Sequence, residues 1–455
     1  MSVPAPGQAA PLERQIDQWR NYLLRRQTIQ AVDVAELEDH LREQVARLAD
    51  AGLAADEAFL VAVKRMGNLD ALSREFAREH SERLWKQLVL PQAETGESPS
   101  RMDAIAAVCF AVAAAVAIKL PELVGLQLDE DAGFYARNAA LLVLPVLAAY
   151  FGWKRHLARG TLGWLAAAFL AAAVFANVYP FEPESSTEAL TAVHLPIALW
   201  LVVGVAYAGD RWRQAGGRMD FIRFSGEWLV YYALIALGGG VLTAFVAVLF
   251  DAIGTDAEPF IQSWLLPCGA AGAVVVASWL VEAKQSVVEN MAPVLARIFT
   301  PLFAVVVVAF VAALLVNGRG VDIDRDLLIQ FNLLLVVVLG LVLYSLSARD
   351  ALAPAGTFDA IQVVLVVSAM VADAVALWAI ATRISDFGFS PNRVAALGVN
   401  ALLMVNLAWS AVLLARLLRG GSFASLERWQ TGYLFVYAGW AAVVVIAFPP
   451  VFGYG

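Results

Sequence analysis

The chain has 455 residues, of which 60% are hydrophobic and 16% are charged, whereas soluble domains hold roughly 45 to 50% apolar and roughly 25% charged residues. Apolar runs of about 20 residues recur from Met102 to the C-terminus, which predicts an all-helical, multi-pass membrane protein. The net charge of −8 argues against nucleic acid as a partner, because phosphate binding needs clustered cationic residues.

The polar N-terminal part precedes the apolar runs. Residues 1–10 are rich in Pro and Ala, and we expect a disordered tail there. Residues 11–90 alternate apolar and charged positions at helical spacing, which predicts a small four-helix domain. Since residues 1–20 lack the apolar core of a signal peptide, we expect this domain on the cytoplasmic side. The four helices are expected near 12–27, 33–51, 55–66 and from 68 onward.

The second of these helices has the clearest boundaries. Asp33 and Glu36 are spaced as a capping box, and Gly52 is a typical helix stop. Its inner face is expected to carry an apolar stripe formed by Leu37, Leu41, Val45 and Leu48. The first helix is expected to place Ile16 inward.

Residues 91–101, rich in Gln, Glu, Gly, Ser and Pro, predict a hydrated linker to the membrane domain, residues 102–448. Residues 449–455 are then a short external tail. Within the membrane domain the apolar runs predict eleven spans, over about 102–124, 135–153, 162–181, 191–208, 228–250, 262–282, 295–316, 328–347, 359–382, 393–418 and 430–448.

The basic residues between these spans predict an orientation. Loops on the same side as the N-terminal domain carry thirteen Lys and Arg, namely Lys154, Arg155, Arg159, Arg211, Arg213, Arg218, Arg223, Lys284, Arg297, Arg349, Arg416, Arg419 and Arg428. The opposite loops carry five, namely Arg137, Arg319, Arg325, Arg383 and Arg393. Positive residues are enriched on the cytoplasmic side, so we expect the N-terminus inside and the C-terminus outside.

Motifs for catalysis or cofactor binding were sought throughout the chain. The sequence holds no GxxxxGK[ST], GxSxG, HExxH or GxGxxG motif. Its two cysteines lie in apolar segments, and its four histidines are scattered without metal-binding spacing. These observations favour a protein without enzymatic activity, and we expect no cofactor and no bound metal.

Ionisable residues inside membrane spans mark functional sites by default. Asp373 lies fourteen residues after Asp359, hence about 21 Å along the helix at about 1.5 Å per residue and near the bilayer midplane. An unpaired carboxylate there costs several kcal/mol, so Asp373 is expected to be protonated, paired or facing water. Asp359 falls on roughly the same face, which indicates that one side of this helix lines a polar cavity. The alternative is a structural Asp373, hydrogen-bonded to a neighbouring helix.

Four further polar residues belong to the candidate intramembrane site. Lys119 lies near the outer end of the first span, where it either extends to the interface or pairs with Asp373. Asn332, Asn400 and Asn406 lie in or beside the eighth and tenth spans, where hydrogen bonds between helices compete with ligand contact as explanations.

A second candidate site lies in the external turn before the tenth span. Ser390 and Pro391 predict a helix start there, as N-cap and first helical residue. Arg383, Asp386 and Arg393 bracket this turn, and the two arginines are either an anion-binding pair or anchors at the membrane interface.

Two stretches of the chain resemble known families. Residues 36–77 resemble the helical prefix domain that precedes bacterial permease-type membrane regions and occurs in proteins linked to PadR-type or anti-sigma regulation. Their sequence is ELEDHLREQVARLADAGLAADEAFLVAVKRMGNLDALSREFA. Two later stretches resemble an uncharacterised bacterial polytopic family: residues 387–410, FGFSPNRVAALGVNALLMVNLAWS, and residues 429–440, WQTGYLFVYAGW. The resemblance implies an architecture and a bacterial inner membrane, and no established activity. The many spans and the lack of a large external domain depart from the pattern of transporter permeases.

Two hypotheses for function follow. In the first, the protein is permease-like and handles a small molecule or ion through a polar intramembrane site near Asp373. In the second, it is a membrane-anchored sensor or scaffold, whose prefix domain binds a cytoplasmic regulator through charged residues such as Glu38, Arg42, Glu43 and Arg47. In both, the bilayer is the main partner.

Overall fold

The computed structural model divides into two units, Met1–Ser98 and Pro99–Gly455. It describes residue 16 and residues 31–50, 53, 58–59, 61–62, 101–283, 291–316, 325–349 and 353–455. The predicted tail, nearly all of the linker and most of the first, third and fourth prefix helices lie outside these residues. The four-helix domain therefore stays a prediction.

The described part of the first unit is centred on α2, Ala31–Asp50. The helix begins two residues before the predicted cap at Asp33, so that residue lies within its first turn. Its apolar stripe is buried as predicted at Leu41, Val45 and Leu48, and it packs in one cluster with Ile16. On the polar side, Arg42 forms an ion pair of 2.8 Å with Glu38, one helical turn earlier.

The second unit is a bundle of helices, and no strand occurs in the ranges that the structure describes. Eleven of its helices are long and apolar enough to cross a membrane, which confirms the predicted number. The chain is therefore a multi-pass helical membrane protein. Its elements are α6 Arg101–Lys119, η1 Leu120–Val124, α7 Ala132–Lys154, α8 Arg159–Val178, α9 Ser186–Ala208, η2 Gly209–Arg213, α10 Ala215–Ala252, α11 Glu258–Phe260, η3 Ile261–Leu265, α12 Leu266–Ala283, α14 Met291–Val316, α15 Arg325–Ser347, α16 Thr357–Phe387, α17 Pro391–Leu418 and α18 Phe423–Val451.

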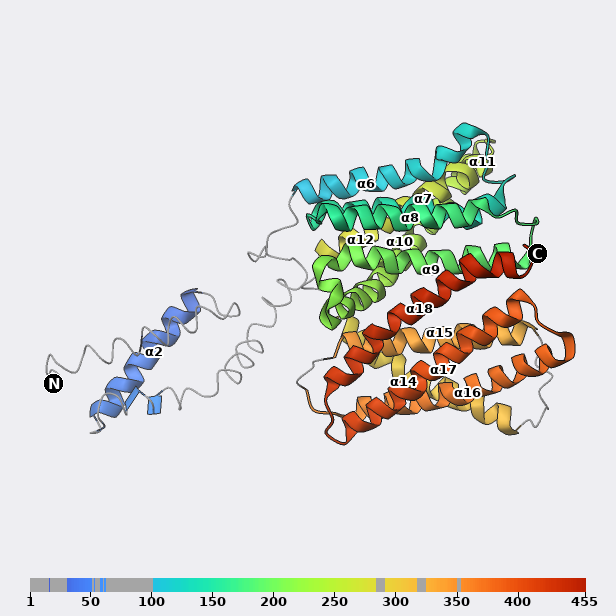
Figure 1. Ribbon diagram of the computed structural model, residues 1–455. Coiled ribbons are helices and arrows are strands. Elements are labelled where there is room, and N and C mark those ends of the chain that lie inside the picture. Colours follow the sequence, from blue (N-terminus) through green and yellow to red (C-terminus); the bar gives the residue numbers. More distant parts are fainter. Residues whose placement is uncertain are drawn as a thin grey trace. The chain divides into compact units, whose positions relative to one another are not determined.

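Two hydrophobic cores divide the bundle into halves. The first core is built from α6 to α12, and the second mainly from α14 to α17. Helix α18 belongs to both, because its start contributes Phe423 and Leu426 to the second core while Val445 joins the first. Figure 1 shows α18 crossing between the two groups of helices. We call these groups the first half and the second half.

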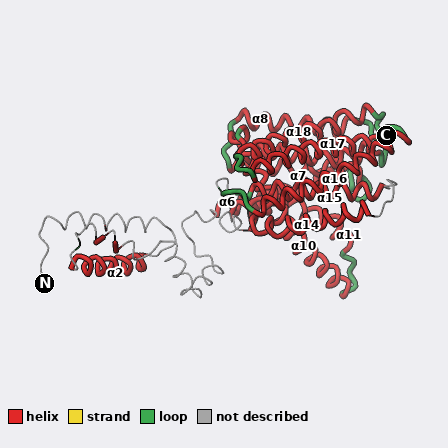
Figure 2. Tube along the Cα trace, turned by 90° about the horizontal axis from the view of Figure 1, so that it is seen from below, coloured by secondary structure: helices red, strands yellow, loops and turns green. Residues whose placement is uncertain are grey.

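Helix α10 differs most from its predicted extent of 228–250. It begins at Ala215 and has 38 residues. Its first part is amphipathic and packs at the end of the bundle, where Arg218 donates to the carbonyl of Thr431 at 3.0 Å and Arg223 to that of Ser347 at 2.9 Å. Its last part is apolar and exposed, and it projects from the bundle together with α11 (Figure 2). The sequence pattern predicted only the apolar part of α10.

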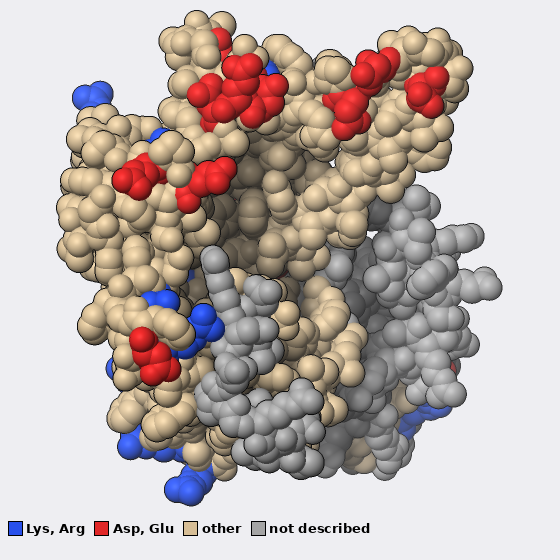
Figure 3. Space-filling view, turned by 90° about the vertical axis from the view of Figure 1, so that its right-hand side faces the viewer, with Lys and Arg blue, Asp and Glu red and all other residues tan. Residues whose placement is uncertain are grey.

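The two ends of the bundle differ in charge. The end that carries the C-terminus has several separate groups of Asp and Glu and is hollowed between them (Figure 3). We call it the acidic end. The opposite end holds most of the arginines, where Lys154 and Arg155 both pair with Glu282 on α12, at 2.5 and 2.6 Å. We call it the basic end.

Candidate functional site

Asp373 lies in the interior of the second half, on α16. Its side chain is fully buried, and neither carboxylate oxygen has a hydrogen-bond partner among the described residues. Its neighbours in the helix, Ala372 and Ala376, belong to an apolar cluster with Phe331 of α15, against which Phe310 of α14 packs. The hydrogen bond to a neighbouring helix that would make Asp373 a structural residue is not formed here.

Asp359 does not extend a polar face from Asp373. One of its oxygens accepts from the backbone N–H of Gly356 at 2.8 Å, which caps the start of α16, and the other pairs with Arg349. The carboxylate is buried and fully engaged at the basic end. Between the two acids the helix packs Val366 and Ala369 into the second core, and the polar cavity along this face of α16 stays a prediction.

Lys119 pairs with Glu122 rather than with Asp373. Its ammonium group also donates to the carbonyl of Ser263 at 2.6 Å and lies 4.4 Å from the centre of the Trp264 ring. Both residues belong to η3, a π-helical turn, and such turns free backbone carbonyls for other donors. The proposed Lys119–Asp373 pair is wrong because the two residues lie in different halves.

The three predicted amides, Asn332, Asn400 and Asn406, form two separate sets of hydrogen bonds. Asn400 donates to Asn332 at 2.7 Å and so joins α17 to α15, while its own side-chain oxygen has no partner in the described part of the chain. Asn406 donates to the hydroxyl of Tyr437 at 2.7 Å, and its side-chain oxygen accepts from Trp429 at 2.9 Å. These contacts tie α17 to α18, as expected for hydrogen bonds between helices.

The turn before α17 is built as the sequence predicts. Ser390 caps the helix by accepting from the N–H of Arg393, and Pro391 is the first helical residue. The guanidinium of Arg393 donates to the carbonyls of Phe387 and Gly388, at 3.0 and 2.8 Å, and so closes the end of α16. Arg383 and Asp386 lie in the last turns of α16. Arg393 thus stabilises the turn through hydrogen bonds, and the anion-binding pair of Arg383 and Arg393 stays a prediction.

A cavity of about 920 Å³ lies between the two halves and was missed from the sequence. Helices α6, α7, α9, α10 and α12 line it from the first half, α15 and α17 from the second, and α18 from the boundary. Its walls are apolar and rich in aromatic rings, among them Tyr135, Trp200, Trp228, Tyr232, Tyr437 and Trp440. None of the predicted polar site residues is among the described residues that line it. Its lining is spread over eight helices far apart in the sequence, which leaves no local pattern that could have revealed it.

Polar atoms in the cavity wall are mostly engaged. The hydroxyl of Tyr135 donates to the carbonyl of Leu126 at 3.1 Å, and the indole N–H of Trp228 donates to that of Val274 at 3.0 Å.

His194 bonds through Nδ1 to the carbonyl of Leu190 at 2.9 Å. A carbonyl can only accept, so Nδ1 carries a proton, and in a neutral ring Nε2 is then an acceptor. The cavity therefore offers a large apolar surface and an imidazole acceptor.

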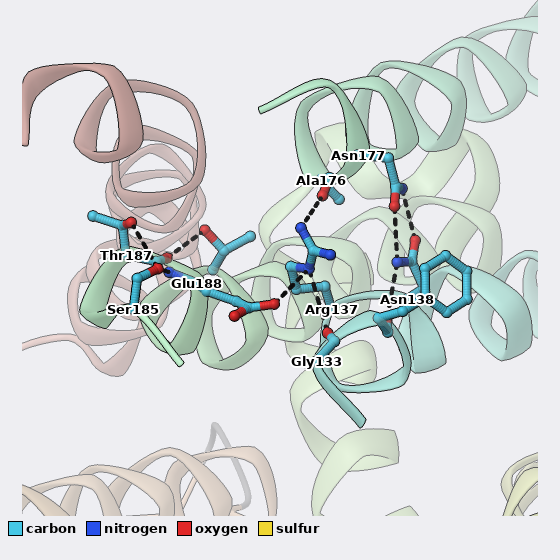
Figure 4. Close-up of polar contacts among 10 residues, drawn as sticks. Gly133, Arg137, Asn138, Ala176, Asn177, Ser185, Thr187 and Glu188 are labelled. Atoms are coloured by element: carbon cyan, nitrogen blue, oxygen red, sulfur yellow. Dashed lines mark hydrogen bonds and ion pairs between the residues drawn. The ribbon is translucent and has the colours of Figure 1, made fainter. Parts of the chain in front are cut away.

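A polar network at the acidic end fixes the helices of the first half around this cavity (Figure 4). Arg137 of α7 pairs with Glu188 of α9 at 3.2 Å and donates to the carbonyl of Ala176 on α8 at 3.3 Å. Beside it, Asn138 and Asn177 exchange hydrogen bonds of 3.0 and 2.8 Å through their amides. These contacts hold α7, α8 and α9 together.

A smaller cavity of about 390 Å³ lies at the basic end of the first half. Its lining includes Arg155, Arg211, Asp220 and Glu227. Arg211 and Asp220 pair at 2.5 Å, and Arg155 is held by Glu282. Since these charges neutralise one another, they hold the loops of the basic end together.

Comparisons of this chain with protein-family models, with curated proteins and with solved structures find no match. Its class is therefore defined by its own architecture, a helical membrane protein with two half-bundles and an apolar cavity between them.

Proposed function

We propose that this protein is permease-like and handles an amphipathic small molecule with a long apolar part, bound in the cavity between the two halves. The observation that carries the proposal is the cavity itself. Small-molecule sites have volumes of roughly 300 to 1,000 Å³ and predominantly apolar, aromatic walls with few polar groups. The cavity of about 920 Å³ has this size and lining.

The chemical class follows from the walls. An ion or a strongly polar solute would lose its hydration there without gaining hydrogen bonds, at a cost of several kcal/mol. An acyl or polyprenyl chain would instead bury apolar surface, at about 25 cal/mol for each Å² removed from water. The acceptor nitrogen of His194 then favours a ligand that carries a hydroxyl or amine donor.

The position between two half-bundles favours movement of the ligand over simple storage. In many carriers the substrate lies between two helical bundles that rock against each other. Here the boundary is crossed by α18, and close contacts such as Trp440 of α18 against Gly398 of α17 lie beside the cavity. The resemblance of the sequence to bacterial families favours a bacterial inner membrane, and the charge difference between the two ends favours an orientation with the basic end in the cytoplasm.

Binding of a radiolabelled long-chain alcohol to the purified full chain in nanodiscs tests the proposal. Ala270 lines the cavity, so Ala270→Phe should reduce affinity by on the order of tenfold, about 1.4 kcal/mol. The matched control is Ala167→Phe, at an exposed position of α8 outside the cavity lining. Equal binding by wild type and both variants would show that the alcohol partitions into lipid only, and the proposal would be wrong.

A further inference from the structure

Asp373 is the only ionisable residue in the middle of α16. The nearest charged residue on this helix is Arg383, ten residues away and thus about 15 Å along the axis at about 1.5 Å per residue. Helices α14, α15 and α17 pack against α16. Their charged and titratable residues lie in the outer turns, at Arg297, Arg325, Asp326, Tyr344, Arg393 and Arg416.

The surroundings of Asp373 determine which ligand its carboxyl group can hold. Metal ions such as Ca²⁺ need about six to eight oxygen ligands. The residues of α16 beside Asp373, Ala372 and Ala376, pack instead in an apolar cluster with Phe331 of α15, against which Phe310 of α14 packs. Both carboxylate oxygens lack partners among the described residues, and an isolated buried carboxylate is unstable unless it is neutralised.

From this geometry we infer that Asp373 is an intramembrane proton-binding site, which holds its proton while α14 and α15 pack against α16. Water reaches the carboxyl group only when these helices separate, because the side chain is fully buried in this conformation. Proton release is thereby linked to a movement within the second half. The inference is independent of the cavity, which Asp373 does not line.

Infrared spectroscopy of the full chain in phosphatidylcholine vesicles tests this inference directly. A protonated carboxyl group has a C=O stretching band distinct from that of a carboxylate. At neutral pH the wild-type protein should show this band, which ¹³C-labelled aspartate should shift and Asp373→Asn should remove. In D₂O the band should shift more slowly than those of exposed groups, since exchange requires helix movement.

The matched control is Asp386→Asn, which removes an exposed carboxylate from the end of the same helix and should leave the band intact. The labelled wild-type protein provides the answer even if Asp373→Asn does not fold. A wild-type spectrum without an aspartic acid band at neutral pH would overturn the inference, because Asp373 would then be ionised. A band that exchanges as fast as exposed groups would overturn the proposed burial from water.

Discussion

Replacing Asp373 separates a packing role from a proton-binding role. Because its oxygens have no partners among the described residues, Asp373→Val removes a buried polar group and should leave stability unchanged or raise it by up to about 2 kcal/mol. Asp373→Asn buries an amide N–H₂ in the same apolar surroundings and should lower stability by about 1 to 3 kcal/mol. The measurement is thermal unfolding in detergent. The opposite order of stabilities would mean that Asp373 has a hydrogen-bond partner.

Lys119 should be among the most sensitive charged residues of the first half. Lys119→Met leaves Glu122 without its partner and removes the donor to the carbonyl of Ser263, so stability should fall by about 1 to 3 kcal/mol. Arg211→Gln is the control, because its pair with Asp220 is exposed and should contribute at most about 1 kcal/mol. Melting temperatures of both variants check this contrast, and equal losses would contradict it.

Single residues show what a membrane sequence can predict. The position of Asp373 along its helix follows from the sequence, because each residue advances a helix by a fixed distance. Its full burial depends on the helices that pack against α16 and does not follow from the apolar run. The partner of Lys119 does not follow, because it depends on which helix lies beside it and on a π-helical turn in that helix. The same holds for Asp359, whose partner Arg349 lies in the preceding turn.

At the level of elements, α17 and α18 are in tight contact at Gly398. A side-chain carbon added there would clash with ring atoms of Trp440, so Gly398→Ala should displace the ring and cost about 1 to 3 kcal/mol. The control is Gly340→Ala on α15, which has open space around it and should be neutral or stabilising by up to about 1 kcal/mol. Thermal unfolding checks both, and a neutral Gly398→Ala would show that α18 shifts easily.

The helices themselves were largely predictable. Apolar runs and turn residues gave the eleven spans, and the Ser-Pro start of α17 was located to the residue. The predicted spans were too short where an amphipathic segment continues the helix, most of all in α10, because such a segment has no continuous apolar run. The neighbours of each helix, and hence the cavity, could not be predicted, because an apolar helix face can contact either lipid or another helix.

At the level of the whole molecule, the charge difference between the two ends predicts a topology. A reporter fused after Gly455 should be external and one fused before Met1 cytoplasmic, since basic residues favour the cytoplasmic side. Alkaline phosphatase, active outside, and green fluorescent protein, fluorescent inside, provide the measurement. Both termini on one side would mean that one of the eleven candidate helices does not cross the bilayer.

The length of α10 determines which bilayer suits the protein. Arg218 and Arg223 fix its start at the basic end, and the apolar stretch from Trp228 to Phe250 covers 23 residues, about 35 Å at about 1.5 Å per residue. A typical hydrocarbon core is only about 30 Å thick. The projecting part of α10 must therefore tilt or thicken the surrounding lipid, and longer acyl chains relieve this mismatch. Membrane thickness thus acts on a helix whose outer half is largely exposed in the described chain.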